Sequence, residues 1–196
     1  MKPTARLLLL VAVCLAACTS STPSPAPVPA EPTTPPTLSE LLPLADRTVS
    51  TFRTRTDLGD EGLLTLEYYR PRPELAQIEI AGRIQRLRVT AQQVEHATGG
   101  FLLRTPLEVG RTFKGAFGQV RIEQVNLVTE VPAGKLTRCL LTVEESLNPA
   151  KRAETTFCPG IGVAKMVVEA TGDAEVLRLE TELLSHGPRV DLSAAP

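Results

Sequence analysis

From residue 48 to residue 184, apolar and polar residues alternate in short runs that Gly, Pro, Asn and Asp separate. Ile78 and Ile80 stand two positions apart, as do Val120 and Ile122, so each pair lies on one face of an extended strand. Such alternation buries one face and leaves the other in water, as in an antiparallel sheet. The predicted strands cover residues 48–56, 63–70, 77–90, 93–97, 101–104, 111–117, 119–131, 135–146, 154–157, 163–170 and 175–184.

The alternation changes phase within two of the predicted strands, between Ile122 and Val125 and between Ile80 or Ile84 and Leu87. A strand that keeps its apolar residues inward through such a change needs a bulge, and bulges bend sheets. The fold class we predict is therefore all-β, with a single antiparallel, strongly curved sheet in the form of a roll or a partly open barrel.

The first 17 residues have the pattern of a secretory signal. Lys2 and Arg6 are basic, no acid accompanies them, and residues 7–17 form an apolar run of 11. That run is shorter than the roughly 18 residues expected of a membrane-spanning helix, so we expect residues 1–17 to be removed as a signal peptide.

Residues Leu15-Ala16-Ala17-Cys18 end this run and resemble the bacterial lipobox. The resemblance implies that the thiol of Cys18 receives a diacylglyceryl group, that the signal is cut before it, and that the new amino end is acylated. Two or more acyl chains hold a protein on a membrane stably. By resemblance to enterobacterial lipoprotein sorting, Thr19 in place of Asp favours the outer membrane, facing the periplasm. The alternative is an ordinary signal peptide with an incidental cysteine.

The next segment, residues 18–37, reads as a disordered tether. Residues 19–37 contain seven Pro and eight Ser or Thr, and such a segment stays extended and solvated. Fully extended, it would reach roughly 60 Å. We expect the β domain to cover residues 38–190, with Ser39 capping a short helical turn and residues 191–196 forming a tail.

Cys139 and Cys158 are the two cysteines of the predicted domain, and an even pair in an oxidising compartment suggests a disulfide. Asn148 and Pro149 provide a turn between their strands. A turn centred near residue 150 would leave the two cysteines about two positions out of register, so that a bulge or a shifted loop is needed to join them. The alternative is two separate buried thiols.

Three blocks of the domain resemble a family of secreted bacterial β-rich domains known as TapB-like. The blocks are residues 106–113, residues 131–136 with the following Cys139, and residues 156–165. Phe113 stands where the family has Trp more often, Leu136 where it has Phe, and Cys158 is not a usual position. The resemblance implies an antiparallel β fold in the periplasm and no assigned activity.

The charged and catalytic residue types exclude several functions. After removal of residues 1–17 the chain has 19 basic and 22 acidic residues, without blocks of one sign, which gives no footprint for nucleic acid. His96 and His186 are the only histidines and have no second ligand at metal spacing, so we expect them on the surface or in loops. The acids at 57–61 would make at most a weak calcium site. We therefore predict no enzyme, no cofactor and no metal.

These observations favour a non-catalytic, lipid-anchored protein of the bacterial envelope. Its partners would be the membrane, through Cys18, and a protein or glycan of the envelope that the β domain binds or scaffolds. The alternative is a carrier that holds a lipid or an acyl chain against the concave face of the sheet. A packed interior would favour the first function and a hollow interior the second.

Overall fold

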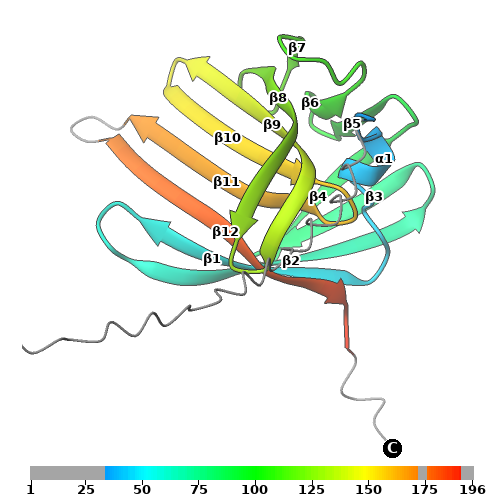
Figure 1. Ribbon diagram of the computed structural model, residues 1–196, viewed down its shortest axis with the longest axis horizontal. Coiled ribbons are helices and arrows are strands. Elements are labelled where there is room, and N and C mark those ends of the chain that lie inside the picture. Colours follow the sequence, from blue (N-terminus) through cyan, green and yellow to red (C-terminus); the bar gives the residue numbers. More distant parts are fainter. Residues whose placement is uncertain (1–33, 172–175, 191–196) are drawn as a thin grey trace, which may run out of the picture. The chain divides into compact units, whose positions relative to one another are not determined.

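The structure is a computed structural model that describes residues 34–171 and 176–190. The predicted signal, Cys18, most of the tether and the tail lie outside these residues. The described residues form one twelve-stranded antiparallel sheet in the order β6-β5-β4-β3-β2-β1-β12-β11-β10-β9-β8-β7 (Figure 1). The elements are α1 (Leu38–Leu41), β1 (Thr48–Thr56), β2 (Glu61–Arg72), β3 (Leu75–Ile80), β4 (Arg83–Val89), β5 (Gln93–His96), β6 (Phe101–Arg104), β7 (Thr112–Lys114), β8 (Gln119–Val131), β9 (Gly134–Leu147), β10 (Ala150–Cys158), β11 (Gly162–Thr171) and β12 (Val176–Pro188).

The sheet curls until its two edge strands, β6 and β7, approach each other. Phe101 on β6 and Phe113 on β7 meet edge to face, with ring centroids 6.4 Å apart. Beside them, a Cβ atom on Gly100 would lie 1.9 Å from the carbonyl oxygen of Gly115, so this close approach of two backbones requires glycine. The predicted antiparallel, strongly curved sheet is thus confirmed, and it is nearly closed into a barrel.

One predicted strand, residues 77–90, is wrong because it contains a turn. Ala81 and Gly82 both have positive φ angles, 49° and 75°, and β3 and β4 pair antiparallel on either side of them. Two consecutive positive φ angles are the mark of the tight turn that fits the twist of a hairpin. The change of phase between Ile80 and Leu87 therefore marks a reversal of the chain instead of a bulge.

The second change of phase does mark a bulge. The register between β8 and β9 shifts between Ile122 and Gln124, and twice more further along β8. The hairpin of β8 and β9 bends there, and its tip reaches β12, where the amide of Ala133 donates to the carbonyl of Leu183 over 3.0 Å. In Figure 1 this hairpin crosses in front of its neighbours.

Cys139 and Cys158 form a disulfide between β9 and β10, with their Cα atoms 4.2 Å apart. The turn between these strands is tighter than the sequence suggested, because Leu147 pairs directly with Ala150. This register brings the two cysteines opposite each other, so the bulge or shifted loop that we expected between them is not needed. The bond lies where β9 bends away from β10.

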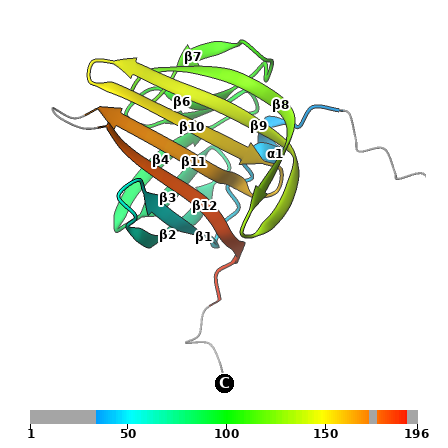
Figure 2. The ribbon, with the colours of Figure 1, turned by 60° about the vertical axis from the view of Figure 1, so that its left-hand side comes forward.

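Helix α1 covers one end of the curled sheet (Figure 2). Its N-cap is Thr37, not Ser39 as predicted: the side chains of Thr37 and Glu40 form a capping box. Leu41 and Leu42 are buried in the core. The carbonyl of Glu40 accepts from the amide of Gly160 over 2.8 Å, which fixes the helix to the turn between β10 and β11.

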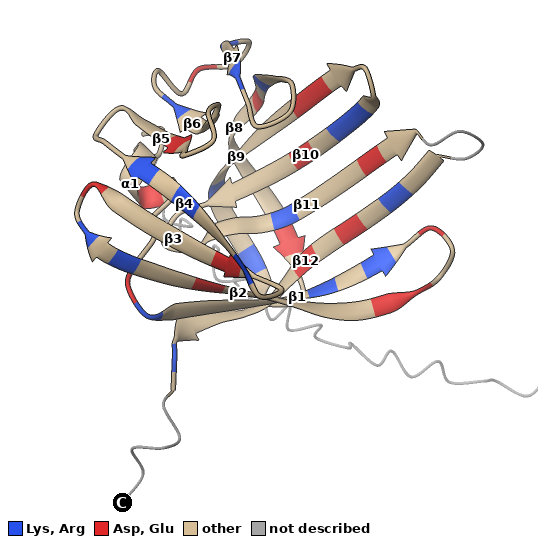
Figure 3. Ribbon diagram, turned by 180° about the vertical axis from the view of Figure 1, so that it is seen from behind, with Lys and Arg blue, Asp and Glu red and all other residues tan. Residues whose placement is uncertain are grey.

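Strands β9–β12 and β1 carry basic and acidic residues side by side (Figure 3). Lys165 forms ion pairs with Glu180 and Glu182, and Glu182 also binds Arg53 over 2.9 Å. Exposed pairs of this kind contribute at most about 1 kcal/mol each. Lys165, Glu180, Glu182 and Arg53 are thus paired with one another, and they contribute little to the stability of the fold.

Candidate functional site: an apolar cavity with a row of threonines

The two ends of the curled sheet differ. The turns between β1 and β2, β3 and β4, β9 and β10, and β11 and β12 lie toward one end, which we call the hairpin end. The turn between β10 and β11 lies at the other end, against α1, which we call the helix end.

A cavity of about 260 Å³ lies inside the sheet. The interior of the protein is therefore partly hollow, and the hollow part is mainly apolar. No Asp, Glu, Lys or Arg is among the residues that line it. Its walls come from both halves of the sheet and from the end of α1, namely Leu42, Phe52, Leu64, Leu66, Tyr68, Ile78, Ile80, Gln85, His96, Leu102, Thr155, Val163, Met166 and Thr181.

A row of inward threonines crosses the strands beside the cavity, and two of them, Thr155 and Thr181, line it. Thr54, Thr181 and Thr155 occupy equivalent inward positions on β1, β12 and β10, with Met166 of β11 between the last two, and Thr142 on β9 continues the row. Thr142 donates to the carbonyl of Thr155 over 3.4 Å. Thr181 is only 2% exposed, and its hydroxyl has no hydrogen-bond partner among the described groups. A buried hydroxyl without a partner is costly, and less than 1 Å² of this oxygen is accessible.

The inward face of β12 becomes more exposed toward the hairpin end. Leu183, opposite Phe52, and Thr181 are both buried. The next inward residues, Leu179 and Leu177, are 36% and 53% exposed. Of these four residues, only Thr181 lines the cavity.

His96 is the last residue of β5 and is partly exposed; it lines a surface hollow as well as the cavity. Burial lowers its pKa from the ordinary value of 6.5, and the charge of Glu144 opposes this effect. The imidazole is therefore neutral near pH 7. The carboxylate of Glu144 accepts from the amides of Phe117 and Gly118 over 2.6 and 2.8 Å, which holds the turn between β7 and β8.

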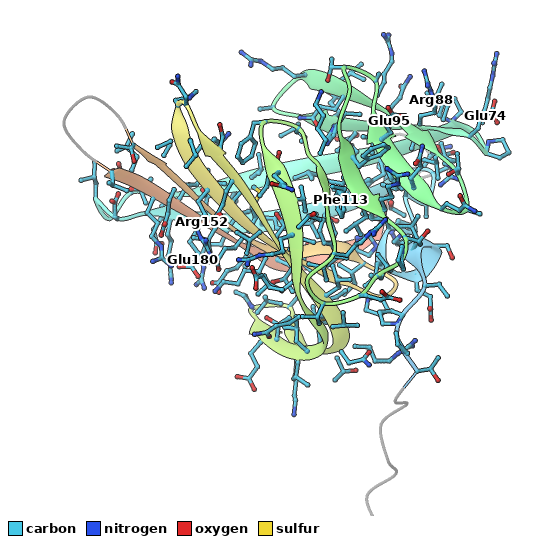
Figure 4. The ribbon with its side chains drawn as sticks, turned by 90° about the horizontal axis from the view of Figure 1, so that it is seen from above. Glu74, Arg88, Glu95, Phe113, Arg152 and Glu180 are labelled. Carbon is cyan, nitrogen blue, oxygen red and sulfur yellow. A yellow bond between two sulfur atoms is a disulfide. The ribbon has the colours of Figure 1, made fainter. Side chains whose placement is uncertain are left out.

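Glu95, adjacent to His96 in sequence, faces away from the cavity, as expected for neighbours on a strand. It lies 3.9 Å from Arg88 of β4. Figure 4 shows this pair on the β3–β5 side of the molecule, with Phe113 nearer the middle and Arg152 and Glu180 on the β10–β12 side.

The base of the sheet near α1 contains a second polar group of residues, Ser50, Tyr68 and His186. The hydroxyl of Ser50 is 2.8 Å from Nδ1 of His186, and the rings of Tyr68 and His186 meet edge to face. Burial lowers the pKa of His186 and raises the pKa of Tyr68. The space beside them measures about 10 Å³, too small for a substrate, and Ser50 is fully buried. The hydroxyl of Ser50 is therefore satisfied by Nδ1 of His186, at a place too narrow for a substrate.

Within residues 34–171 and 176–190, no three His, Cys, Asp or Glu residues gather as metal ligands. In the same part of the chain, no helix is both long and apolar enough to cross a membrane. The sequence did not identify the cavity residues. Its one available signal was the spacing of Thr142, Thr155 and Thr181 within apolar strands, since a threonine on the apolar phase of a strand points inward.

Comparisons with known proteins add little. No family model matches the sequence, and no curated protein matches it. The resemblance to the TapB-like family therefore stays a prediction. One similar solved structure is that of a protein from Bacteroides fragilis NCTC 9343, inferred to be exported, with a YmcC-like fold. It is 10% identical, with a TM-score of 0.47, and the match covers 73% of this chain and 96% of that one. The site described above thus rests on this chain's own residues.

Proposed function

We propose that this protein is an exported, lipid-anchored protein of the bacterial envelope whose β domain binds an acyl chain and catalyses no reaction. The apolar cavity carries the proposal. A hollow interior distinguishes a carrier of an apolar ligand from a domain that only scaffolds other envelope components. Attachment through Cys18, and the outer membrane as the location, are inferred from the sequence.

The size of the cavity fits one acyl chain of medium length. A methylene group occupies about the volume of a water molecule in the liquid, about 30 Å³, so 260 Å³ holds about nine carbon atoms. Each buried methylene contributes about 0.8 kcal/mol, which is opposed by the entropy lost on binding.

Two adjacent residues of β2 provide a direct test. The side chain of Leu64 is half-buried and lines the cavity, whereas Leu63 points to the other face and is 74% exposed. Leu64→Trp should fill part of the cavity and weaken binding of a fluorescent ten-carbon acyl probe by at least about tenfold, the equivalent of about 1.4 kcal/mol. Leu63→Trp is the matched control and should bind as the unchanged protein does. Equal binding by both variants, or no binding by the unchanged protein, contradicts the proposal.

The anchor is tested separately. Cys18→Ala should move the protein from the detergent-extracted membrane fraction to the soluble fraction of the cells. An unchanged distribution would rule out attachment through this residue, without bearing on the cavity.

A binding function toward an envelope protein or glycan is the second candidate. Exposed apolar residues on three neighbouring hairpins favour it: Leu58, Leu63, Leu147 and Val176 are each more than half exposed. Apolar side chains gathered at one end of a molecule are typical of an interaction surface. Loss of a co-purifying envelope component on Leu147→Ser, with acyl binding intact, would support this function.

A further inference from the structure

A surface hollow of about 380 Å³ adjoins the apolar cavity. Its lining includes Gln85 and Arg86 of β4, His96 at the end of β5, Thr98 in the turn that follows, and Ala116 in the turn between β7 and β8. Gln85 and His96 also line the cavity. These two side chains therefore form the boundary between the hollow and the cavity.

The hollow lies where β5 ends and β4 continues. The pairing of the two strands stops at Leu87 and His96. Only the hydrogen bond from the amide of Ala97 to the carbonyl of Arg86, over 2.9 Å, continues it. Residues 83–85 of β4 extend past this point, and the structure describes no strand beside them on this side. The wall of the nearly closed sheet is therefore interrupted at the hollow.

Gln85 and His96 both point inward and can both be reached from solvent. Leu87, which is fully buried, pairs with His96, and Gln85 lies two residues before Leu87 on the same face of β4. Gln85 is exposed and His96 is partly exposed. Neither side chain forms a hydrogen bond with another described residue. A few polar groups beside an apolar cavity are typical of a site that fixes the orientation of its ligand.

The groups at this boundary favour a polar head group without charge. The amide of Gln85 and the neutral imidazole of His96 can each donate and accept a hydrogen bond, as hydroxyl groups do. Arg86 is the one Lys or Arg of the hollow, and as the neighbour of Gln85 it points to the opposite face of β4. The charge of Glu144 acts on His96 and would oppose a carboxylate placed beside it.

We propose that the hollow binds the uncharged, hydroxyl-bearing head group of a single-chain acyl ester, such as a monoacylglycerol, while the acyl chain occupies the cavity. Gln85 and His96 form hydrogen bonds with the head group where it leaves the cavity. This step rests on the proposed function, since the acyl chain has to lie in the cavity. Gln85 can move aside for the ligand without breaking a hydrogen bond to a described residue.

The experiment compares the affinities of 1-monodecanoylglycerol, methyl decanoate and decanoate for the full chain, by competition against the fluorescent acyl probe. The first two ligands share the acyl chain and the ester and differ in the hydroxyl groups of glycerol. Monodecanoylglycerol should bind about two- to tenfold more tightly than methyl decanoate, the effect of one neutral hydrogen bond. Decanoate should bind more weakly than both esters.

Three variants make the result specific. Gln85→Met and His96→Phe keep the approximate size of each side chain and remove its polar atoms. Each should reduce the preference for monodecanoylglycerol by at least about twofold and leave the affinity for methyl decanoate nearly unchanged. Gln77→Met is the matched control, because Gln77 adjoins Ile78 of the cavity wall and points to the other face of β3. Circular dichroism verifies folding, and the exposed position of Gln85 makes Gln85→Met the variant that decides.

The outcomes separate the two proposals. If the unchanged protein binds none of the three ligands, the proposed function fails and this inference with it. If methyl decanoate binds as tightly as monodecanoylglycerol, if decanoate binds most tightly, or if Gln85→Met keeps the full preference, the inference alone is overturned.

Discussion

The helix end and the cavity wall each bury a hydroxyl group. Among the described residues, only the hydroxyl at the helix end has a hydrogen-bond partner. At the helix end, Ser50 is fully buried and bound to His186 over 2.8 Å. On the cavity wall, Thr181 is almost as deeply buried, and its hydroxyl has no partner among the described residues. Buried polar groups in folded proteins are nearly always satisfied. The helix end therefore satisfies its buried hydroxyl within the fold, whereas the cavity wall does not.

The largest loss of stability is expected from a substitution at the helix end. Leu41 of α1 is fully buried, and Leu41→Ala should lower the free energy of unfolding by about 2–5 kcal/mol, because it removes buried methyl groups and leaves a void. Chemical denaturation measures this change. A loss below about 1 kcal/mol would show that α1 is not part of the core, and the distinction between the two ends would fail.

The disulfide gives the next largest effect. It closes a loop between positions 19 residues apart, and its loss in the double variant Cys139→Ala with Cys158→Ala should cost about 3 kcal/mol in the chain-entropy model. Neither cysteine lines the cavity, so affinity for the acyl probe should stay the same. The unchanged protein under reducing conditions is the control. A double variant that is as stable as the oxidised protein would contradict the stabilising role of the bond.

Removal of the Ser50 hydroxyl should lower the free energy of unfolding, whereas removal of the Thr181 hydroxyl should not. Ser50→Ala leaves His186 without its partner and should destabilise the protein by about 1–3 kcal/mol. Thr181→Val removes an unsatisfied group and should leave the empty protein as stable as before or more stable by about 1 kcal/mol. Thermal unfolding of ligand-free protein compares the two. Equal losses would mean that Thr181 has a structural partner.

The smallest effect is a pH dependence that involves both regions. Burial lowers the pKa of His186 at the helix end and of His96 at the cavity below the ordinary value of 6.5. The unfolded chain therefore takes up protons first as the pH falls, and the free energy of unfolding should decrease below about pH 6.5, until the folded protein is protonated as well. Denaturation at a series of pH values tests this. His186→Gln should reduce the slope, and an unchanged slope would show that His186 does not contribute to it.

The sequence predicted the sheet well because its alternation is local. Most strand positions and the curvature follow from the phase of residues such as Val120 and Ile122. The turn at Ala81 and Gly82 was missed because Ile84 carries the apolar pattern onward through it. Alanine is also an uncommon residue at a positive φ angle.

The site could not be predicted because it depends on contacts between strands that are far apart in the sequence. Phe52, Ile78 and Met166 face one another only after the sheet curls, and no local pattern shows whether apolar side chains fill the space between them. Likewise, the pairing of Ser50 with His186 joins positions 136 residues apart. The sequence identified the faces of the strands, and packing determined that one part of the interior is hollow.

A crystal structure of the protein with methyl decanoate would test the ligand site most directly. The predicted result is density for one extended acyl chain in the cavity, in contact with Phe52, Ile78 and Met166. A cavity that stays free of the ester at saturating concentration, or an ester bound only elsewhere, would contradict it.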